Sequence, residues 1–129
     1  MARASKSGER TSGFSLMEML LVLAIIGALA AVATPVVQGA LVRAKEAALR
    51  ENLAVMRKLI DDYAADRAEQ PETLQTLVDE GYLRAIPPDP LANGATEWTE
   101  VPAKDGSGIA TIHSRSVEKG LNGVPYAEW

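Results

Sequence analysis

The spacing of apolar residues divides the chain into three stretches. Residues 1–13 are polar and basic, residues 14–42 are almost uniformly apolar, and the remainder mixes apolar and charged positions. No charged side chain occurs from Met19 to Val42. This run exceeds the ~20 residues that a helix needs to cross a hydrocarbon core of ~30 Å, so it predicts a membrane-spanning helix.

The helical pattern continues beyond the apolar run but changes its character. From Leu49 to Tyr63 apolar residues recur at steps of four, three, four and three, with charged residues between them. This spacing predicts an amphipathic helix whose apolar stripe packs on a small domain. We therefore expect one long helix from about Phe14 to about Arg67.

Pro35 and Gly39 lie inside this predicted helix. A proline removes a backbone hydrogen bond and costs ~3 kcal/mol in a helix interior, and a glycine costs ~1 kcal/mol relative to alanine. The segment 34–39 is therefore predicted to break the helix, either as a kink or as a place where it unwinds in an assembly. The alternative is a simple bend of the kind that membrane helices tolerate.

The residues after the long helix predict a short helix and a small sheet. Leu74, Leu77 and Val78 have helical spacing, and Gly81 is a suitable C-terminal cap. Tyr82, Leu83 and Ile86 are expected to form an apolar patch, and the prolines of 87–90 favour an extended loop.

Alternating residues at 97–101 and 109–113 flank the turn signal of 105–108, which predicts two or three antiparallel strands. Strict alternation would place Ile109 and Thr111 on one face of the second strand, and Ala110 and Ile112 on the other. We expect Tyr126 and Trp129 to fold back over the sheet. The predicted fold class is α+β, with the long N-terminal helix packed on a small antiparallel sheet.

Composition and charge narrow the possible classes of protein. The chain has no cysteine, so no disulfide can stabilise it, and with one Phe, three Tyr and two Trp any core is small. The formal net charge is −4, and it would be −6 without residues 1–13. An acidic product argues against nucleic acid as a partner. Basic residues before the apolar run predict that the N-terminus stays cytoplasmic and the remainder is exported.

Glu18 distinguishes the apolar run from an ordinary secretory signal peptide. The run is too long for a typical signal sequence, and Glu18 lies just inside it. A carboxylate in an apolar helix is costly, so such a residue usually has a function. A simpler role is also open, because acids are favoured near a helix N-terminus.

The segment Gly13-Phe14-Ser15-Leu16-Met17-Glu18 resembles the processing signal of type IV pilins and type II secretion pseudopilins, and Pro35 matches a proline of that family. The resemblance implies that prepilin peptidase cuts after Gly13 and methylates the amino group of Phe14. It also implies that Glu18 of an incoming subunit pairs with the Phe14 amine of its neighbour, which would set the register of a helical homo-oligomeric filament.

The head most resembles the major pseudopilin of type II secretion. In that group a segment like Gly81-Tyr82-Leu83 is followed by a Pro-Asp-Pro loop, strands and a C-terminal loop that ends in an aromatic residue, and residues 81–91 and 124–129 fit this order. This implies three regions: a cleaved leader at 1–13, a transmembrane and filament-core helix at 14–42, and a periplasmic head at 43–129. The implied location is the bacterial inner membrane, with a single pass, and then a periplasmic filament. Implied partners are membrane lipid, prepilin peptidase, the inner-membrane assembly platform and minor pseudopilins.

Major pseudopilins usually hold calcium in the C-terminal loop through Asp side chains, and this chain departs from that pattern. Residues 114–129 contain no Asp. The remaining oxygen donors, which could contribute, are Ser114, Ser116, Glu118 and Asn122. We therefore expect no cofactor, and the missing acidic pair argues against the usual calcium site.

Nothing in the sequence points to an enzyme. His113 lies in a predicted strand without a nucleophile motif around the neighbouring serines, and Asp61 and Asp62 lie on the polar side of the long helix. The predicted function is a structural subunit of the type II secretion pseudopilus that drives protein export across the outer membrane. Two alternatives stay open: a type IV pilus subunit serving adhesion, motility or DNA uptake, and a membrane-tethered binding module that does not polymerise.

Overall fold

The computed structural model describes residues 13–129, so all of the predicted leader at 1–13 except Gly13 lies outside the described residues. The chain forms two units, one ending at Gln38 and the other spanning Gly39–Trp129. Helix α1, Leu16–Arg67, contributes to both. The head adds helix α2, Leu74–Asp79, strands β1, Thr99–Pro102, and β2, Ile109–His113, and the 3₁₀ helix η1, Tyr126–Glu128. The predicted α+β architecture is confirmed.

Helix α1 begins and ends close to its predicted limits. Within the described residues its first buried residue is Glu46, and the predicted stripe follows at the same helical spacing. The chain leaves the helix at Ala68, whose positive φ of 55° turns the backbone toward Pro71. The stripe is buried along its whole length: Leu49, Leu53, Met56, Ile60 and Tyr63.

Helix α2 is short because its capping residues define both ends. Thr73 and Thr76 form a reciprocal capping box that satisfies free backbone amides at the N-terminus. Beyond the C-terminus, Gly81 adopts a φ of +81°, a conformation that glycine tolerates best. Leu74 and Leu77 point into the core, as their spacing predicts.

The sheet contains a bulge that the sequence pattern does not reveal. β1 and β2 pair antiparallel, with Val101 opposite Thr111 but Pro102 opposite Ile109, so Ala110 is the extra residue. The bulge brings Ile109 and Ile112 to the same buried face and leaves Ala110 exposed. The predicted strict alternation is therefore wrong. The first strand also lies two residues later than predicted at its start, and Trp98 is buried just before it.

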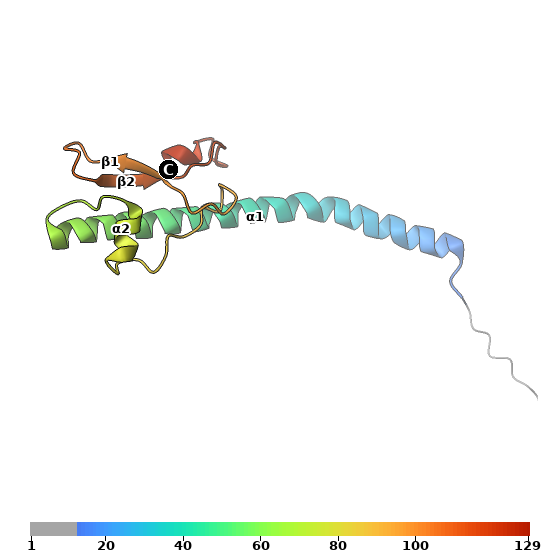
Figure 1. Ribbon diagram of the computed structural model, residues 1–129. Helices are drawn as coiled ribbons and strands as arrows, with labels where there is room; N and C mark the ends of the chain where they lie inside the picture. Colours follow the sequence, from blue (N-terminus) through green and yellow to red (C-terminus); the bar gives the residue numbers. More distant parts are fainter. Residues whose placement is uncertain (1–12) are drawn as a thin grey trace, which may run out of the picture. The chain divides into compact units, whose positions relative to one another are not determined.

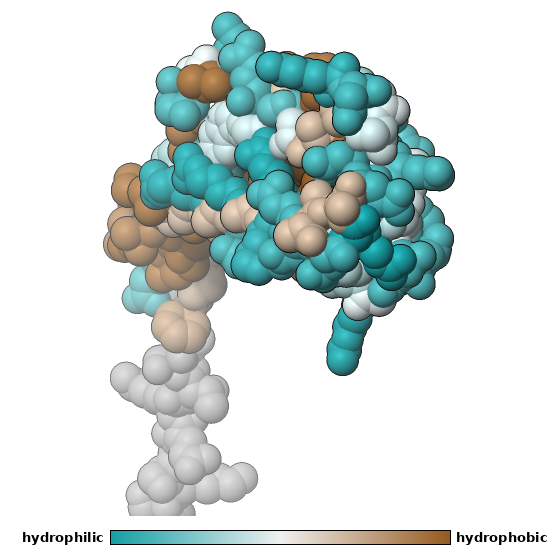
Figure 2. All heavy atoms as spheres, turned by 90° about the vertical axis from the view of Figure 1, so that its left-hand side faces the viewer, coloured by the Kyte–Doolittle hydropathy of each residue, from teal (hydrophilic) through white to brown (hydrophobic). Residues whose placement is uncertain are grey.

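The core of the head is a single layer of side chains between α1 and the other elements. Figure 1 shows β1 and β2 side by side along the C-terminal half of α1, with η1 next to them. Tyr126 of η1 is buried in the same cluster as the α1 stripe, so the predicted fold-back of the tail is confirmed. The face of the head in Figure 2 is mostly hydrophilic, as expected for a surface in water. The other core members are Leu74, Leu77, Trp98, Ile109 and Ile112.

Gly108 joins the start of β2 to the loop after α1. Its φ is +134°, and a Cβ built on it would lie 2.4 Å from the carbonyl oxygen of Pro71. The same carbonyl accepts a hydrogen bond from the Ile109 amide at 2.9 Å. A side chain at position 108 would therefore separate two backbones that are hydrogen-bonded to each other.

We expect Gly108→Ala to reduce the free energy of unfolding by about 2–5 kcal/mol, from backbone strain and steric overlap together. Gly106→Ala is the matched control, because Gly106 also has positive φ but open space around its Cβ position. It should cost only about 1–2 kcal/mol. Urea unfolding of the detergent-solubilised full-length chain measures both losses, and equal losses would contradict the close approach.

Candidate processing and assembly segment

The segment from Gly13 to Glu18 forms the start of α1. Gly13 is exposed, and nothing lies within 4 Å of the position where its Cβ would be. Ser15 caps the helix: its Oγ accepts a hydrogen bond from the Glu18 amide at 3.2 Å, and its carbonyl accepts one from Met19 at 3.2 Å. A side-chain oxygen at this position satisfies a backbone amide that has no partner inside the helix.

Glu18 occupies the first turn of α1, where the positive end of the helix dipole favours an acid. Its side chain is exposed, and the next charged residue along α1 is Arg43. The structure thus places Gly13, Phe14 and Glu18 together at one helix end, as predicted. The geometry agrees with a capping role for Glu18 and leaves its carboxylate available to a second molecule.

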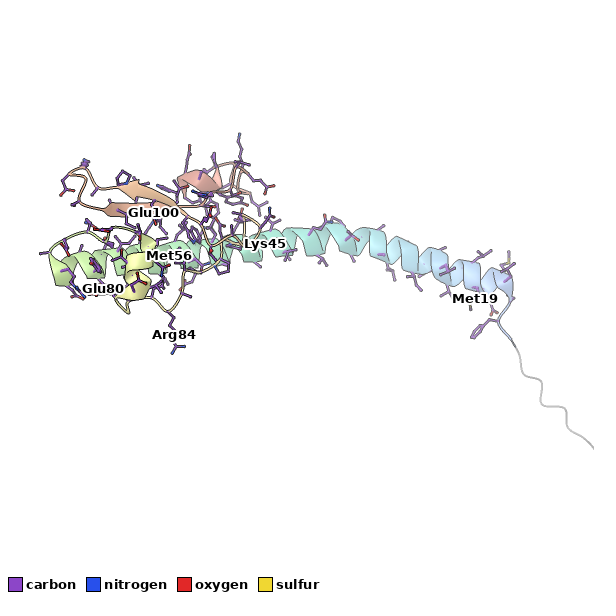
Figure 3. The ribbon with its side chains drawn as sticks, viewed as in Figure 1. Met19, Lys45, Met56, Glu80, Arg84 and Glu100 are labelled. Atoms are coloured by element: carbon purple, nitrogen blue, oxygen red, sulfur yellow. The ribbon has the colours of Figure 1, made fainter. Side chains whose placement is uncertain are left out.

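The apolar part of α1 is not covered by any of the residues that the structure describes. Phe14 is 80% exposed, and every large apolar side chain from there to Leu41 is at least 40% exposed. Figure 3 shows Met19 on this part of the helix, whereas Met56 lies between α1 and the sheet. Among the described residues, α1 is the one helix long and apolar enough to cross a membrane, and its most apolar stretch is not buried at all.

Pro35 and Gly39 do not interrupt the helix. The α-helical backbone is continuous from Leu16 to Arg67, with Pro35 inside it. Next to the proline, the Thr34 hydroxyl donates to the Ala30 carbonyl at 2.8 Å, a contact that membrane helices use near irregularities. The helix is therefore not interrupted at segment 34–39 in the single chain, and both a kink there and its unwinding in an assembly stay predictions.

The residues considered for a metal site differ in how they present their oxygens. Ser114 and Ser116 are buried, and the Ser114 hydroxyl donates to Asp89 Oδ2, whereas Glu118 and Asn122 are exposed. The Ser116 amide donates to Ser114 Oγ at 3.1 Å, and the Val124 amide donates to Asn122 Oδ1 at 3.1 Å. Nδ1 of His113 lies 2.7 Å from the backbone oxygen of Trp129, so this side chain helps to hold the C-terminal tail.

Asp89 is a buried acid that the sequence pattern did not single out. Its side chain is 0% exposed, accepting from Ser114 Oγ at 2.5 Å and from the Leu91 amide at 2.9 Å. Its own amide donates to Ala95 at 2.8 Å, and its carbonyl accepts from Gly94 at 2.9 Å. Asp89 therefore folds its loop and ties it to the end of β2. The Pro-Asp-Pro sequence signals a turn, but the burial depends on a serine 25 residues away.

Glu46 is the second buried acid, and it too was not singled out. It is 4% exposed and stands at the N-terminal end of the apolar stripe of α1. Its Oε1 accepts hydrogen bonds from the Tyr126 hydroxyl at 2.9 Å and the Leu121 amide at 2.8 Å. Burial raises the pKa of Tyr126 to about 12, and the bond to Glu46 acts in the same direction.

The sequence of the chain matches one family model and several known proteins. Residues 10–34 match the family model described as the prokaryotic N-terminal methylation motif. The chain is similar to the type II secretion system core protein G of Klebsiella pneumoniae, with 30% identity over 98 residues covering 64% of this chain and 70% of that protein. The core protein G of Pseudomonas aeruginosa shares 31% over 98 residues, covering 64% and 69%. That of Escherichia coli K12 shares 27% over 104 residues, covering 68% and 72%. No solved structure matches the chain.

The raised pKa of Tyr126 predicts a specific loss of stability in alkali. The phenol loses its proton near pH ~10 in the unfolded chain but only near pH 12 in the folded head. The folded state then holds the extra proton, so the free energy of unfolding falls as the pH rises from ~10 to ~12. Tyr126→Phe removes this titration, and denaturant unfolding across that window should show a shallower decline than the wild type. Parallel declines would contradict the assignment.

Proposed function

The chain belongs to the family of type II secretion system core protein G, and on that basis we propose that it is a structural subunit of a type II secretion pseudopilus. In this role the subunit is anchored in the inner membrane, processed at its N-terminus and polymerised into a periplasmic filament. The filament would drive protein export across the outer membrane. No catalytic role is part of the proposal.

Residues 14–41 carry the proposal, because their apolar side chains are exposed all around α1. A contiguous apolar surface of this size is not stable in water and marks a membrane or protein contact. Before assembly, lipid would cover it, since the segment is long enough to span a bilayer. In a filament, the same segments of other copies would cover it instead.

Cleavage would create a positively charged partner for Glu18 that the precursor does not have. Cleavage after Gly13 would leave a positive amine on Phe14, at the edge of the same apolar helix. A carboxylate and an amine are each costly in apolar surroundings, and removing one partner of a buried pair is more damaging than removing both. We therefore propose that Glu18 of one subunit pairs with the Phe14 amine of the next, which would fix the register between copies.

The orientation follows from charge. Arg3, Lys6 and Arg10 precede the apolar run, so the N-terminus would face the cytoplasm and the head the periplasm. The predicted partners are consistent with this orientation: prepilin peptidase and the assembly platform would act at the inner membrane, and minor pseudopilins would join the filament. Nucleic acid is not a proposed partner.

Mass spectrometry of the protein extracted from membranes tests processing. We expect the loss of Met1 to Gly13 and the gain of one methyl group. Gly13→Leu should abolish both changes, because a side chain at the cleavage position would obstruct a tight protease site. Gly27→Ala is the matched control, since Gly27 lies in the open apolar helix and should leave processing intact. A mature protein that starts anywhere other than Phe14 would contradict the proposal.

Glu18→Ala tests assembly separately from anchoring. The variant should be exported and cleaved normally but should be lost from sheared filaments, because the Phe14 amine would lack its partner. Ser15→Ala is the control: it removes the helix cap, at a cost of ~1 kcal/mol, but keeps the carboxylate, so filaments should persist. If Glu18→Ala assembles as well as the wild type, the residue is only a helix-terminal acid and the proposed pairing with the Phe14 amine is wrong.

A further inference from the structure

Glu46 fastens the C-terminal loop to α1. The carboxylate stands on the buried face of the helix, one residue after Lys45, which is labelled in Figure 3. Its two donors, the Leu121 amide and the Tyr126 hydroxyl, are 75 and 80 residues further along the chain. A carboxylate buried without donors would be strongly destabilising, so these two bonds are required where the loop meets the helix.

Gly120 allows the close approach that this contact needs. The residue is buried, and a Cβ built on it would lie 2.6 Å from the Trp129 ring and 3.2 Å from Glu46 Oε1. Any larger residue would push the loop off the carboxylate. The loop itself closes locally, because the Gly120 amide and the Val124 carbonyl are hydrogen-bonded at 2.8 Å.

Arg57 fastens the end of the same tail further along α1. Its Nη2 donates to the backbone oxygens of Ile112 at 2.8 Å and Trp129 at 2.5 Å. The guanidinium of Arg50 lies 4.4 Å from the centre of the Trp129 ring, within the range of a cation–π contact. The tail is thus held to α1 at two places by an acid and by two basic side chains.

These contacts leave the loop poorly suited to calcium, which takes six to eight oxygen ligands and prefers carboxylates. Beyond Asp105 the chain has only Glu118 and Glu128 as acids. Residues 13–129 contain no group of three or more His, Asp or Glu that could hold a metal. Among the side-chain oxygens near the loop, Ser116 Oγ already accepts from the Glu118 amide, Asn122 Oδ1 accepts from the Val124 amide, and Glu46 Oε1 accepts an N–H and an O–H.

We propose that Glu46, with the Leu121 amide and the Tyr126 hydroxyl, replaces a metal ion as the closure of the C-terminal loop, so that this head folds and stays folded without calcium. The polarity of the donors supports the replacement. An N–H and an O–H direct positive hydrogens at Glu46 Oε1, so these hydrogens oppose the binding of a cation to this oxygen. The proposal concerns the head alone and does not depend on filament formation.

Thermal unfolding of the full-length chain in detergent tests this inference, with Trp98 and Trp129 fluorescence as the signal. The unfolding temperature should differ by less than about 1 °C between excess EDTA and millimolar calcium chloride. Because a ligand that binds only the folded state raises stability by mass action, a rise of about 5 °C or more with calcium would overturn the proposal. Stoichiometric calcium uptake in equilibrium dialysis would overturn it as well.

Substitutions at position 46 separate a hydrogen-bond acceptor from a metal ligand. Glu46→Ala should lower the unfolding temperature by several degrees, equally in EDTA and in calcium. Glu46→Gln keeps one acceptor oxygen and should recover part of the loss. Glu51→Gln, at an exposed acid of the same helix, is the matched control and should change nothing. If Glu46→Ala does not fold, Glu46→Gln and Tyr126→Phe supply the same comparison.

Hydrogen exchange gives a local readout that general destabilisation would not mimic. In Glu46→Gln the Leu121 amide and the rest of 117–126 should exchange faster, while α2 keeps its protection. Uniformly faster exchange across the head would overturn the assigned role of Glu46. Slower exchange of 117–126 in the wild type on addition of calcium would also overturn it.

Discussion

The structure depends on one helix that must satisfy two different surroundings. From Leu16 to Leu41 the large apolar side chains of α1 are exposed, and none of the described residues covers them. From Glu46 to Tyr63 the same helix presents one buried stripe, and residues of α2, β2 and η1 join that stripe in the core of the head. In the proposed role, lipid or other copies would cover the first part, whereas the second part completes its own core.

The head has a small apolar core, and two buried acids fix the loops around it. Glu46 ties the C-terminal loop to α1, and Asp89 ties the loop after α2 to the residue that follows β2. A buried charge with its partners adds little net stability, but removing one partner is strongly destabilising. Such contacts therefore favour the one arrangement of the chain in which all partners are present. In a chain without cysteine, these contacts join distant segments as disulfides do in many small secreted domains.

Features with local causes could be predicted from the sequence. The stripe from Leu49 to Tyr63, the cap after α2 and the limits of β2 follow from spacing and turn residues within a few positions. The processing motif is equally local. The bulge at Ala110 could not be predicted, because it depends on how β2 pairs with β1. Glu46 lies three residues before Leu49, in register with the stripe, which is a local signal of burial, but its donors are 75 and 80 residues away and could not be predicted.

Electron cryo-microscopy of the assembled filament tests most directly whether copies of the chain cover the apolar part of α1 in register. We expect a helical filament in which residues 14–41 of neighbouring subunits pack together, with the heads outside. The Glu18 carboxylate of one subunit would lie within hydrogen-bonding distance of the Phe14 amine of the next. A filament in which the heads make the contacts and Glu18 faces solvent would contradict this expectation.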